Sequence, residues 1–276
     1  MIPLFDFHSH TTYQDGNNSA SEMVEAAIAK GLSVYGISEH HPRHPDFRYS
    51  DDPPDEIRGL KEWPNYLAEM DELKDKYSEK IELLKASEFD WLHKDHLNEW
   101  EKWRAESDYD YIIGSVHYLG HWGFDYFEDW EKGYKGYDSI EQIYETYYQE
   151  VVNMVESASH LFDIVGHLDL IKKFVIDKPK NAVEMSFPAL DAIAKTDLVM
   201  ELSSAGLVSK CKDWYPNQEI LRAARERNIP ITIDSDAHQT ERIAENFEKA
   251  IELAKSVGYD SVVCFHRGGE REIVKL

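Results

Sequence analysis

Two residues near the start of the chain have the types and the spacing of a metal site. The segment Phe5-Asp6-Phe7-His8-Ser9-His10-Thr11 begins with an apolar stretch and then places two histidines two positions apart. Because side chains of an extended strand alternate between its faces, His8 and His10 project the same way, roughly 6–7 Å apart along the chain. Two imidazoles at that spacing can share one metal ion or bind two adjacent ions, although a pair of surface histidines would look the same.

Side chains that can bind metals recur where later apolar segments end. We expect strands at 33–38, 81–87, 109–116, 163–166 and 230–235, and each is followed closely by a histidine or a carboxylate: His40, Glu88, His117, His167, and Asp236 with His238. Any one of these could be a core, capping or surface residue. It is improbable that a separate structural reason placed a possible ligand at the end of every strand. Their common position at strand ends therefore predicts one site to which many strands contribute.

Helical segments separate these strands. We expect helices at 19–31, 63–77, 93–104, 139–157, 187–194, 218–226 and 243–256, further strands at 198–202 and 261–265, and long loops at 41–60 and 120–138. This alternation predicts a parallel sheet, either closed into a barrel or open and doubly wound. The barrel is favoured, because it brings the carboxyl ends of all its strands to one mouth, whereas an open sheet would spread the ligands along a line.

Composition narrows the class of protein. The 276 residues are 42% hydrophobic, enough for a sizeable core, and no domain boundary or repeat interrupts them, so we expect one domain spanning 1–276. The net charge of −23 disfavours nucleic acid and anionic membranes as partners. Cys211 and Cys264 are too few and too far apart for a disulfide framework, and no apolar run is long enough for a membrane span, which favours the cytoplasm.

The ligand types narrow the choice of metal. All candidates are imidazoles or carboxylates, which suit Zn, Mn or Fe, and none is a thiolate. Six histidines with at least two carboxylates exceed what one ion can bind. We therefore expect two or three divalent ions, with a carboxylate such as Glu88 able to bridge a pair. Closely spaced ions can clamp a phosphoryl or carbonyl group and lower the pKa of a bound water towards 7.

Taken together, the motifs resemble the PHP (polymerase and histidinol phosphatase) family. In chain order they are H-x-H-T at 8–11, S-E-H at 38–40, A-S-E-F-D at 86–90, G-S-V-H at 114–117, G-H-L-D at 166–169 and D-S-D-A-H at 234–238. Within that family the chain is similar to the stand-alone histidinol-phosphate phosphatases. The resemblance implies a distorted (β/α)7 TIM-like barrel with three metal ions at the carboxyl ends of the strands. Since eight apolar segments are present, we expect 261–265 to be additional or misassigned.

The family pattern also implies how the ligands are shared. One metal would be bound by His8, His10, Glu88 and Asp236, a second by Glu88, His117 and His167, and a third by His40, His238 and Asp15. Asp15 lies in a loop whose register the sequence does not fix, so a role as an ordinary Asp-Gly turn residue stays open as the alternative.

Substrate contacts are implied in the same way. Lys173 follows the G-H-L-D motif, where related phosphatases place a phosphate-binding arginine; a lysine keeps the charge but lacks the bidentate fork. Ser203 stands where the family has an asparagine, Arg267 could be a second phosphate contact or a surface residue, and His41 could touch substrate or lie exposed. Acids of the first long loop are available for a substrate ammonium or imidazole: Asp46, Asp51, Asp52 and Glu56.

These features predict metal-dependent hydrolysis of a small phosphate monoester, and the resemblance implies L-histidinol phosphate, in histidine biosynthesis. Glu88 and Asp236 would act within the metal cluster on the attacking water, and Asp15 or His238 would supply a proton to the leaving alkoxide. Three alternatives remain: a PHP-type phosphoesterase acting on nucleotides or phosphotyrosine, a metal-dependent amidohydrolase, and a non-catalytic metal-binding domain. Amidohydrolase barrels often bridge their metals with lysine, so glutamate at position 88 favours the phosphatase.

Overall fold

Seven parallel strands form the centre of the computed structural model, which describes residues 5–52, 59–175 and 178–276. Neighbouring strands pair in parallel in the order β1-β2-β3-β4-β7-β8-β9. Their bounds are β1 Phe5–Asp6, β2 Val34–Ile37, β3 Glu82–Asp90, β4 Tyr111–Ser115, β7 Ile164–Val165, β8 Val199–Ser203 and β9 Ile231–Asp234. Strand order follows chain order throughout, as the alternating pattern predicts.

The first and last strands of this sheet meet, and their junction closes the barrel. Ser9 and Ala237 form an isolated parallel bridge just beyond β1 and β9. Beside it, buried side chains join the two edges: the amide of Phe7 donates to Asp234 Oδ1 (2.7 Å), and the amide of Ser235 donates to Asp6 Oδ1 (3.0 Å). The predicted α/β barrel is therefore confirmed, and the open sheet is excluded.

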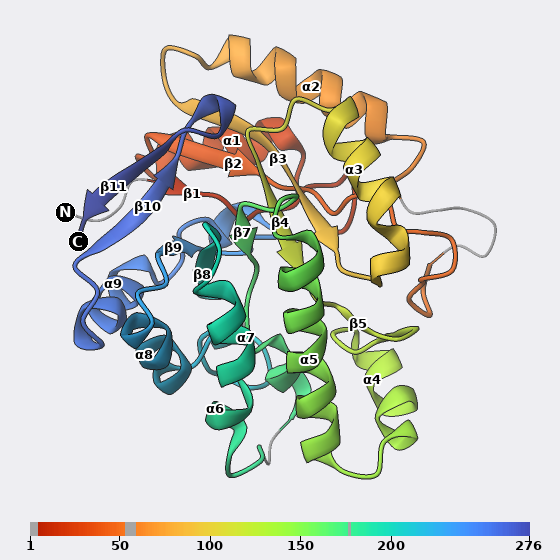
Figure 1. The fold of residues 1–276 in the computed structure, drawn as a ribbon. Helices are drawn as coiled ribbons and strands as arrows, with labels where there is room; N and C mark the ends of the chain where they lie inside the picture. Colours follow the sequence, from red (N-terminus) through yellow and green to blue (C-terminus); the bar gives the residue numbers. More distant parts are fainter. Residues whose placement is uncertain (1–4, 53–58, 176–177) are drawn as a thin grey trace.

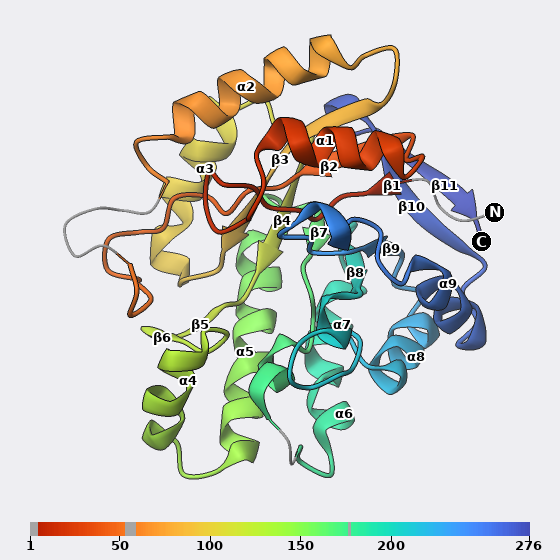
Figure 2. The ribbon, with the colours of Figure 1, turned by 180° about the vertical axis from the view of Figure 1, so that it is seen from behind.

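Helices surround the strands (Figure 1). The view from behind in Figure 2 shows α1 and α2 on one side of the barrel and α5 to α9 on the other. The helices are α1 Ala20–Ala29, α2 Trp63–Lys76, α3 Leu97–Glu106, α4 Phe127–Gly133, α5 Ile140–Ala158, α6 Ala182–Met185, α7 Phe187–Ile193, α8 Gln218–Glu226 and α9 Phe247–Ser256. Short 3-10 helices are η1 Lys94–His96, η2 Tyr134–Gly136, η3 Leu170–Phe174, η4 Ala205–Leu207, η5 Thr240–Arg242 and η6 Arg267–Gly269.

Local chemistry explains where the helices begin and which faces they bury. Ser19 and Glu22 form a capping box at the start of α1, and Ser139 caps α5 by accepting a hydrogen bond from the amide of Gln142. The apolar residues at helical spacing along α5 are buried from Ile143 to Met154, and Ile140 is partly exposed. In α1 the buried residues are Ala20, Met23, Val24 and Ala27, while Ala26 and Ile28 are partly buried against the same core.

The eighth apolar segment lies outside the seven-stranded sheet. β10 (Ser261–Phe265) pairs antiparallel with β11 (Arg271–Lys275), and this hairpin lies against the barrel (Figure 1). The Phe265 ring is 5.5 Å from the rings of both Phe7 and Tyr111. Tyr111 fits into the barrel because position 36 is glycine, where a Cβ would lie 1.8 Å from the tyrosine hydroxyl. Segment 261–265 is thus a real strand that packs beside the barrel.

Two expectations about connecting segments are wrong. The region 120–138 contains secondary structure, namely α4, η2 and β6 (Trp122–Gly123), which pairs with β5 (Tyr118–Leu119). The last long helix begins at Phe247 instead of Ile243, because Ala244 and Asn246 have positive φ angles of 53° and 63°. No helix among the described residues is long and apolar enough to cross a membrane.

Candidate metal centre

The carboxyl ends of the barrel strands bring the predicted ligands together. His8 and His10 follow β1, His40 follows β2, Glu88 belongs to β3, His117 follows β4, His167 follows β7, and Asp236 and His238 follow β9. Except for His238, whose side chain is 35% exposed, and Asp236 at 16%, these side chains are at most 10% exposed. Asp15 reaches the same cluster from the loop after His10.

Glu88 lies at the middle of the first group. Its Oε1 atom is 2.9 Å from His167 Nε2 and 3.6 Å from His117 Nε2. Its Oε2 atom is 3.0 Å from His40 Nδ1 and 3.3 Å from His8 Nε2. Oε2 also lies 3.6 Å from His10 Nε2. Each oxygen therefore faces different imidazoles, which is the arrangement of a carboxylate able to bridge two ions.

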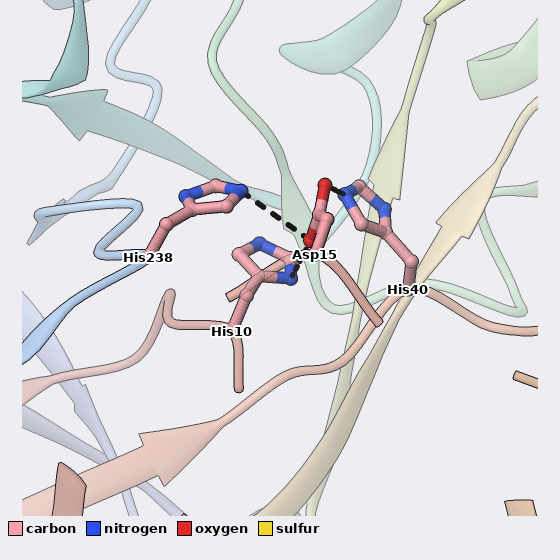
Figure 3. Close-up of side chains that lie close together, drawn as sticks. All are labelled: His10, Asp15, His40 and His238. Atoms are coloured by element: carbon pink, nitrogen blue, oxygen red, sulfur yellow. Dashed lines mark ion pairs between the residues drawn. The ribbon is translucent and has the colours of Figure 1, made fainter. Parts of the chain in front are cut away.

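A second group surrounds Asp15 (Figure 3). Its Oδ1 atom is 3.5 Å from His238 Nε2 and 4.0 Å from His10 Nδ1, and its Oδ2 atom is 3.6 Å from His40 Nε2. Asp236 connects this group to the first, because its Oδ1 atom lies 3.3 Å from His10 Nε2. The structure thus brings Asp15 to the cluster and does not leave it as an isolated turn residue.

The side chains present fit divalent metal ions. Several buried nitrogen and oxygen atoms that face the cluster have no hydrogen-bond partner: His8 Nε2, both ring nitrogens of His10, His40 Nδ1 and Glu88 Oε2. An unpaired buried polar atom is costly, so such atoms call for a ligand. Metal bonds of 2.0–2.2 Å in tetrahedral geometry set adjacent ligand atoms about 3.4 Å apart, close to the separations seen around Glu88.

The charges of the cluster point to a cation as well. Burial alone raises the pKa of a carboxyl, yet His8 and the other imidazoles around Glu88 hold the pKa of this side chain well below its usual range. Burial lowers the pKa of His40 to about 4, which leaves this imidazole neutral and able to bind a metal. For His10 burial lowers the pKa, but Asp236, Glu39 and the other carboxylates around it together raise the pKa to about 10. The carboxylates thus stay ionised and attract positive charge into the site.

A further ring of carboxylates orients the imidazoles. Glu201 of β8, fully buried, accepts a hydrogen bond from His8 Nδ1 (2.7 Å), and Asp90 of β3 bonds His117 Nδ1 in the same way. These bonds leave Nε2 of each ring free to face the cluster, as carboxylates behind metal-binding histidines do. The sequence prediction missed both roles. A signal existed for Asp90, which is two residues after Glu88 and so shares its face of the strand.

A cavity of about 370 Å³ opens above the cluster. Its lining includes Glu88, His117, His167 and, from the predicted substrate contacts, Lys173. Lys173 Nζ lies 3.6 Å from Asp125 Oδ2. The neighbouring Lys172 is buried elsewhere and pairs with Asp169 and Asp213, so only the second lysine of the pair reaches the cavity. Other lining residues are Arg43, Tyr49, Asp51, Asp125 and Tyr126.

Three predicted substrate residues are not brought to the cavity. Ser203 is buried, and its hydroxyl accepts the amide of Ala205. His41 is also buried, and its ring stacks on Trp103 at 4.0 Å, away from the cluster. Arg267 is exposed in the β10–β11 connection, where its amide donates to Glu82 at the opposite end of β3 from Glu88. None of these three residues lines the cavity, so we assign no substrate contact to them.

The described acids of the first long loop lie in different surroundings. Asp51 lines the cavity, and Asp52 pairs with Arg43 at 3.6 Å. Asp46 is 71% exposed, and Glu56 lies outside the described residues. Among the three of these acids that the structure describes, Asp51 is the one that lines the cavity.

One further group of metal-binding residue types lies outside the cavity. His44, His96 and Glu99 place ligand atoms within 4.8 Å of one another. However, His44 Nδ1 accepts the amide of Asp46 (3.2 Å), which puts the ring proton on Nε2, the atom that faces Glu99 at 4.0 Å. A protonated nitrogen cannot bind a metal, so we assign none to this group.

A parallel α/β barrel with clustered imidazoles and carboxylates at the carboxyl ends of its strands defines a metal-binding barrel protein. The family model described as PHP domain matches residues 6–205. The chain is 33% identical over 268 residues to the probable histidinol-phosphatase of Deinococcus radiodurans, covering 97% of this chain and 98% of that protein. The chain belongs to the PHP domain family, as its motifs predict.

Two solved structures share the fold. The putative histidinol phosphatase of Listeria monocytogenes superposes with a TM-score of 0.79 at 24% identity, covering 89% of this chain and 99% of the other. The histidinol phosphate phosphatase of Lactococcus lactis, solved with zinc, L-histidinol and phosphate, gives a TM-score of 0.78 at 20% identity, covering 99% and 100%. At these identities the likeness concerns the fold, and it agrees with the expected distorted barrel.

Proposed function

We propose that this protein hydrolyses L-histidinol phosphate to L-histidinol and inorganic phosphate, a step of histidine biosynthesis. The observation that carries the proposal is the convergence of six imidazoles and the carboxylates of Asp15, Glu88 and Asp236 in one cluster, four of whose imidazoles line the cavity: His40, His117, His167 and His238. The Deinococcus relative named probable histidinol-phosphatase supports the substrate, since it matches nearly the whole chain. The Lactococcus structure, which holds zinc, L-histidinol and phosphate, supports it further.

Two or three divalent ions, Zn, Mn or Fe, are proposed to occupy the cluster. The proposed ligand sets are His8, His10, Glu88 and Asp236; Glu88, His117 and His167; and His40, His238 and Asp15. His10 faces Asp236 through Nε2 and Asp15 through Nδ1, which makes it the imidazole that joins the first set to the third. When bound, such ions supply Lewis acidity, which offsets phosphoryl charge and strengthens water as a nucleophile at neutral pH.

The residues of the chain have distinct parts in this reaction. Glu201 and Asp90 hold His8 and His117 in the orientation that leaves Nε2 available. Lys173 binds a phosphoryl oxygen as a point charge. The leaving alkoxide needs a proton, for which Asp15 and His238 are the candidates, because they line the cavity and are about one third exposed.

The cavity and the charge of the protein bear on its partners. A volume of about 370 Å³ lies within the range of sites for small molecules. The net charge of −23 opposes the binding of a polyanion. We therefore propose a small phosphate monoester as the substrate. We also propose that residues 1–276 form one catalytic domain, because the seven parallel strands make a single barrel, and that the protein acts in the cytoplasm.

Steady-state phosphate release tests the proposal. L-Histidinol phosphate would be compared with p-nitrophenyl phosphate, nucleotide monophosphates, cyclic diesters and phosphotyrosine, with Zn, Mn or Fe supplied. We expect kcat/KM for L-histidinol phosphate of ~10⁴ M⁻¹s⁻¹ or above, orders of magnitude over the other esters. If it is hydrolysed no faster than p-nitrophenyl phosphate, the histidinol assignment fails, and a preferred nucleotide or phosphotyrosine would replace it.

The amidohydrolase alternative has less support. Glu88 is the residue at the proposed bridging position, whereas Lys85 of the same strand pairs with Asp71 (2.8 Å) and Asp108 (2.5 Å). Among the described residues that line the cavity the one lysine is Lys173, which faces Asp125 at 3.6 Å. Hydrolysis of amide substrates without phosphatase activity would overturn this reading.

A further inference from the structure

Arg43 occupies an unusual position for an arginine in a proline-rich loop. It comes three residues after His40, its side chain is 6% exposed, and it lines the same cavity as Glu88 and His117. An arginine is rarely buried to this degree unless it is paired or binds an anion. Its surroundings therefore bear on what the cavity binds.

Three neighbours fix the guanidinium group. Nε lies 3.4 Å from Asp90 Oδ2, Nη1 lies 3.6 Å from Asp52 Oδ1, and the guanidinium carbon lies 4.4 Å from the centre of the Tyr49 ring. Tyr49 is itself held, because its hydroxyl donates to Asp125 Oδ1 (2.5 Å). Neither Nε nor Nη1 makes a hydrogen bond, and across the described chain no acceptor is bound to Nη2. The guanidinium group of Arg43 is thus held in place, while its N–H donors remain able to bind a ligand.

Asp90 connects Arg43 to the metal cluster. One oxygen of Asp90 bonds His117 Nδ1, and the other faces Arg43 Nε. His117 Nε2 in turn faces Glu88 at 3.6 Å. Asp90 and His117 therefore connect the guanidinium of Arg43 to Glu88 at the centre of the cluster. A phosphoryl group placed over the cluster would come within reach of this wall of the cavity.

The carboxylates that line the cavity outnumber its cationic side chains, so a bound anion would need a cation such as Arg43. Its lining includes five carboxylates, Asp15, Asp51, Glu88, Asp125 and Asp236, but among the described lining residues the only cations besides histidine are Arg43 and Lys173. Lys173 already faces Asp125 at 3.6 Å. The proposed ions would offset Asp15, Glu88 and Asp236, but Asp51 and Asp125 are not proposed ligands and would repel a dianionic ester. A guanidinium offers such an ester a planar pair of donors.

We propose that Arg43 is a substrate-binding residue whose Nη2 donates to the phosphoryl group, with Lys173 as the second cation. This inference rests on the proposed function and adds a residue that specifies the phosphate end of the substrate. Tyr49, Asp52 and Asp90 serve as positioning residues that hold the guanidinium. The residue acts in binding the anion and leaves the binding of metal unchanged.

Calorimetric binding of inorganic phosphate to the metal-loaded protein tests the proposal without requiring turnover. The variants are R43M, R43K and, as a matched control, R48M, since Arg48 lies in the same loop but does not line the cavity. Loss of one charged hydrogen bond predicts a Kd for phosphate raised roughly 10- to 100-fold in R43M. R43K, which keeps the charge but not the fork, is expected to show at least a fivefold increase. R48M is expected to stay within twofold of the parent protein.

Two further readouts separate anion binding from a structural role. Metal content per chain is expected to be unchanged in R43M and R43K, and Kd for L-histidinol, which lacks phosphate, is expected to change less than threefold. Unchanged phosphate affinity in either folded variant would overturn the proposal. So would loss of metal in step with affinity, because Arg43 would then act through Asp90 on His117. If L-histidinol phosphate is not a substrate, the proposed function fails while the phosphate measurement still decides the role of Arg43.

Discussion

Removing the charge of Glu201 gives the most direct test of how the cluster is organised. The carboxylate is fully buried and accepts two hydrogen bonds, from His8 Nδ1 at 2.7 Å and from the backbone amide of His167. In the variant Glu201→Gln the amide oxygen can accept one of these bonds, but the NH2 group must face the other donor. The substitution therefore keeps the shape of the side chain and removes one buried charged hydrogen bond.

The size of the effect follows from that loss. A buried donor left without an acceptor costs about 1–3 kcal/mol, so the free energy of unfolding of the metal-free protein should fall by that amount. Partners that orient metal-binding histidines are worth 10–100-fold in metal affinity or activity. We expect the affinity of the Glu201→Gln protein for zinc to fall by this factor, about 1.4–2.8 kcal/mol.

Competition with a chelator of known zinc affinity would measure the change, and denaturant unfolding of the metal-free form would measure stability. Glu226→Gln is the matched control, because Glu226 is exposed at the end of α8. A zinc affinity within threefold of the parent protein would show that the orientation of His8 does not depend on this carboxylate.

Three further predictions concern the metals and the hairpin. Glu88→Gln should lower kcat/KM for phosphate release by more than about 100-fold and reduce metal content, since both oxygens face imidazoles; full metal content with full activity would contradict the bridging role. Dialysis against a chelator should abolish phosphate release, lower the free energy of unfolding by about 2.7 kcal/mol relative to protein with metal at 100 times its Kd, and be reversed by adding metal back; activity that survives removal of the metal would refute the mechanism. His266→Gln should destabilise the protein by less than about 1 kcal/mol at pH 6 and by less at pH 9. The hydrogen bond to Glu82 raises the pKa of His266, so its contribution is complete below about pH 6.5 and is lost as pH rises through the raised pKa; equal losses in urea unfolding at both pH values would disprove this linkage.

The sequence was informative where chemistry and periodicity coincide. A strand that ends in a possible ligand can be recognised in the sequence, because an apolar segment stops at a charged or imidazole side chain that is uncommon in a core. The same pattern recurs at six strands. Parallel pairing then forces those ends to meet, so the positions of His8, His117 and His167 relative to one another followed from topology alone. Long amphipathic helices such as α5 were visible for a similar reason.

Residues whose environment is created by distant segments were not visible. Arg43 looks like a surface residue between two prolines, and its burial depends on Tyr49, Asp52 and Asp90 folding around it. Glu201 lies within an apolar strand, where nothing nearby reveals that His8, far away in the chain, will meet it. Burial and pairing of this kind come from tertiary contacts, which a local pattern does not contain.

The sequence did not predict the short elements, for a different reason. β5, β6 and α4 have two to seven residues, too few to show a period, and they are held by aromatic contacts such as that of Trp122 with Trp130. Segment 243–246 has helical composition, but the amide of Ala244 donates to Asp6 Oδ2 and the backbone there turns to positive φ. In both cases a tertiary contact overrides the local preference.

The seam between β1 and β9 has a consequence for how the protein is made. The two edges joined by Asp6 and Ser235 are 229 residues apart in the sequence, and the proposed ligands of a single ion, His8 and Asp236, lie on opposite sides of that seam. During synthesis on the ribosome the first histidines therefore emerge long before their partners exist. An ion bound across the seam would act as a staple on a very long loop, whose closure entropy would otherwise favour opening. Maturation of the site and completion of the barrel would then be one event, so a chain that ends before residue 236 should neither close nor load its metals.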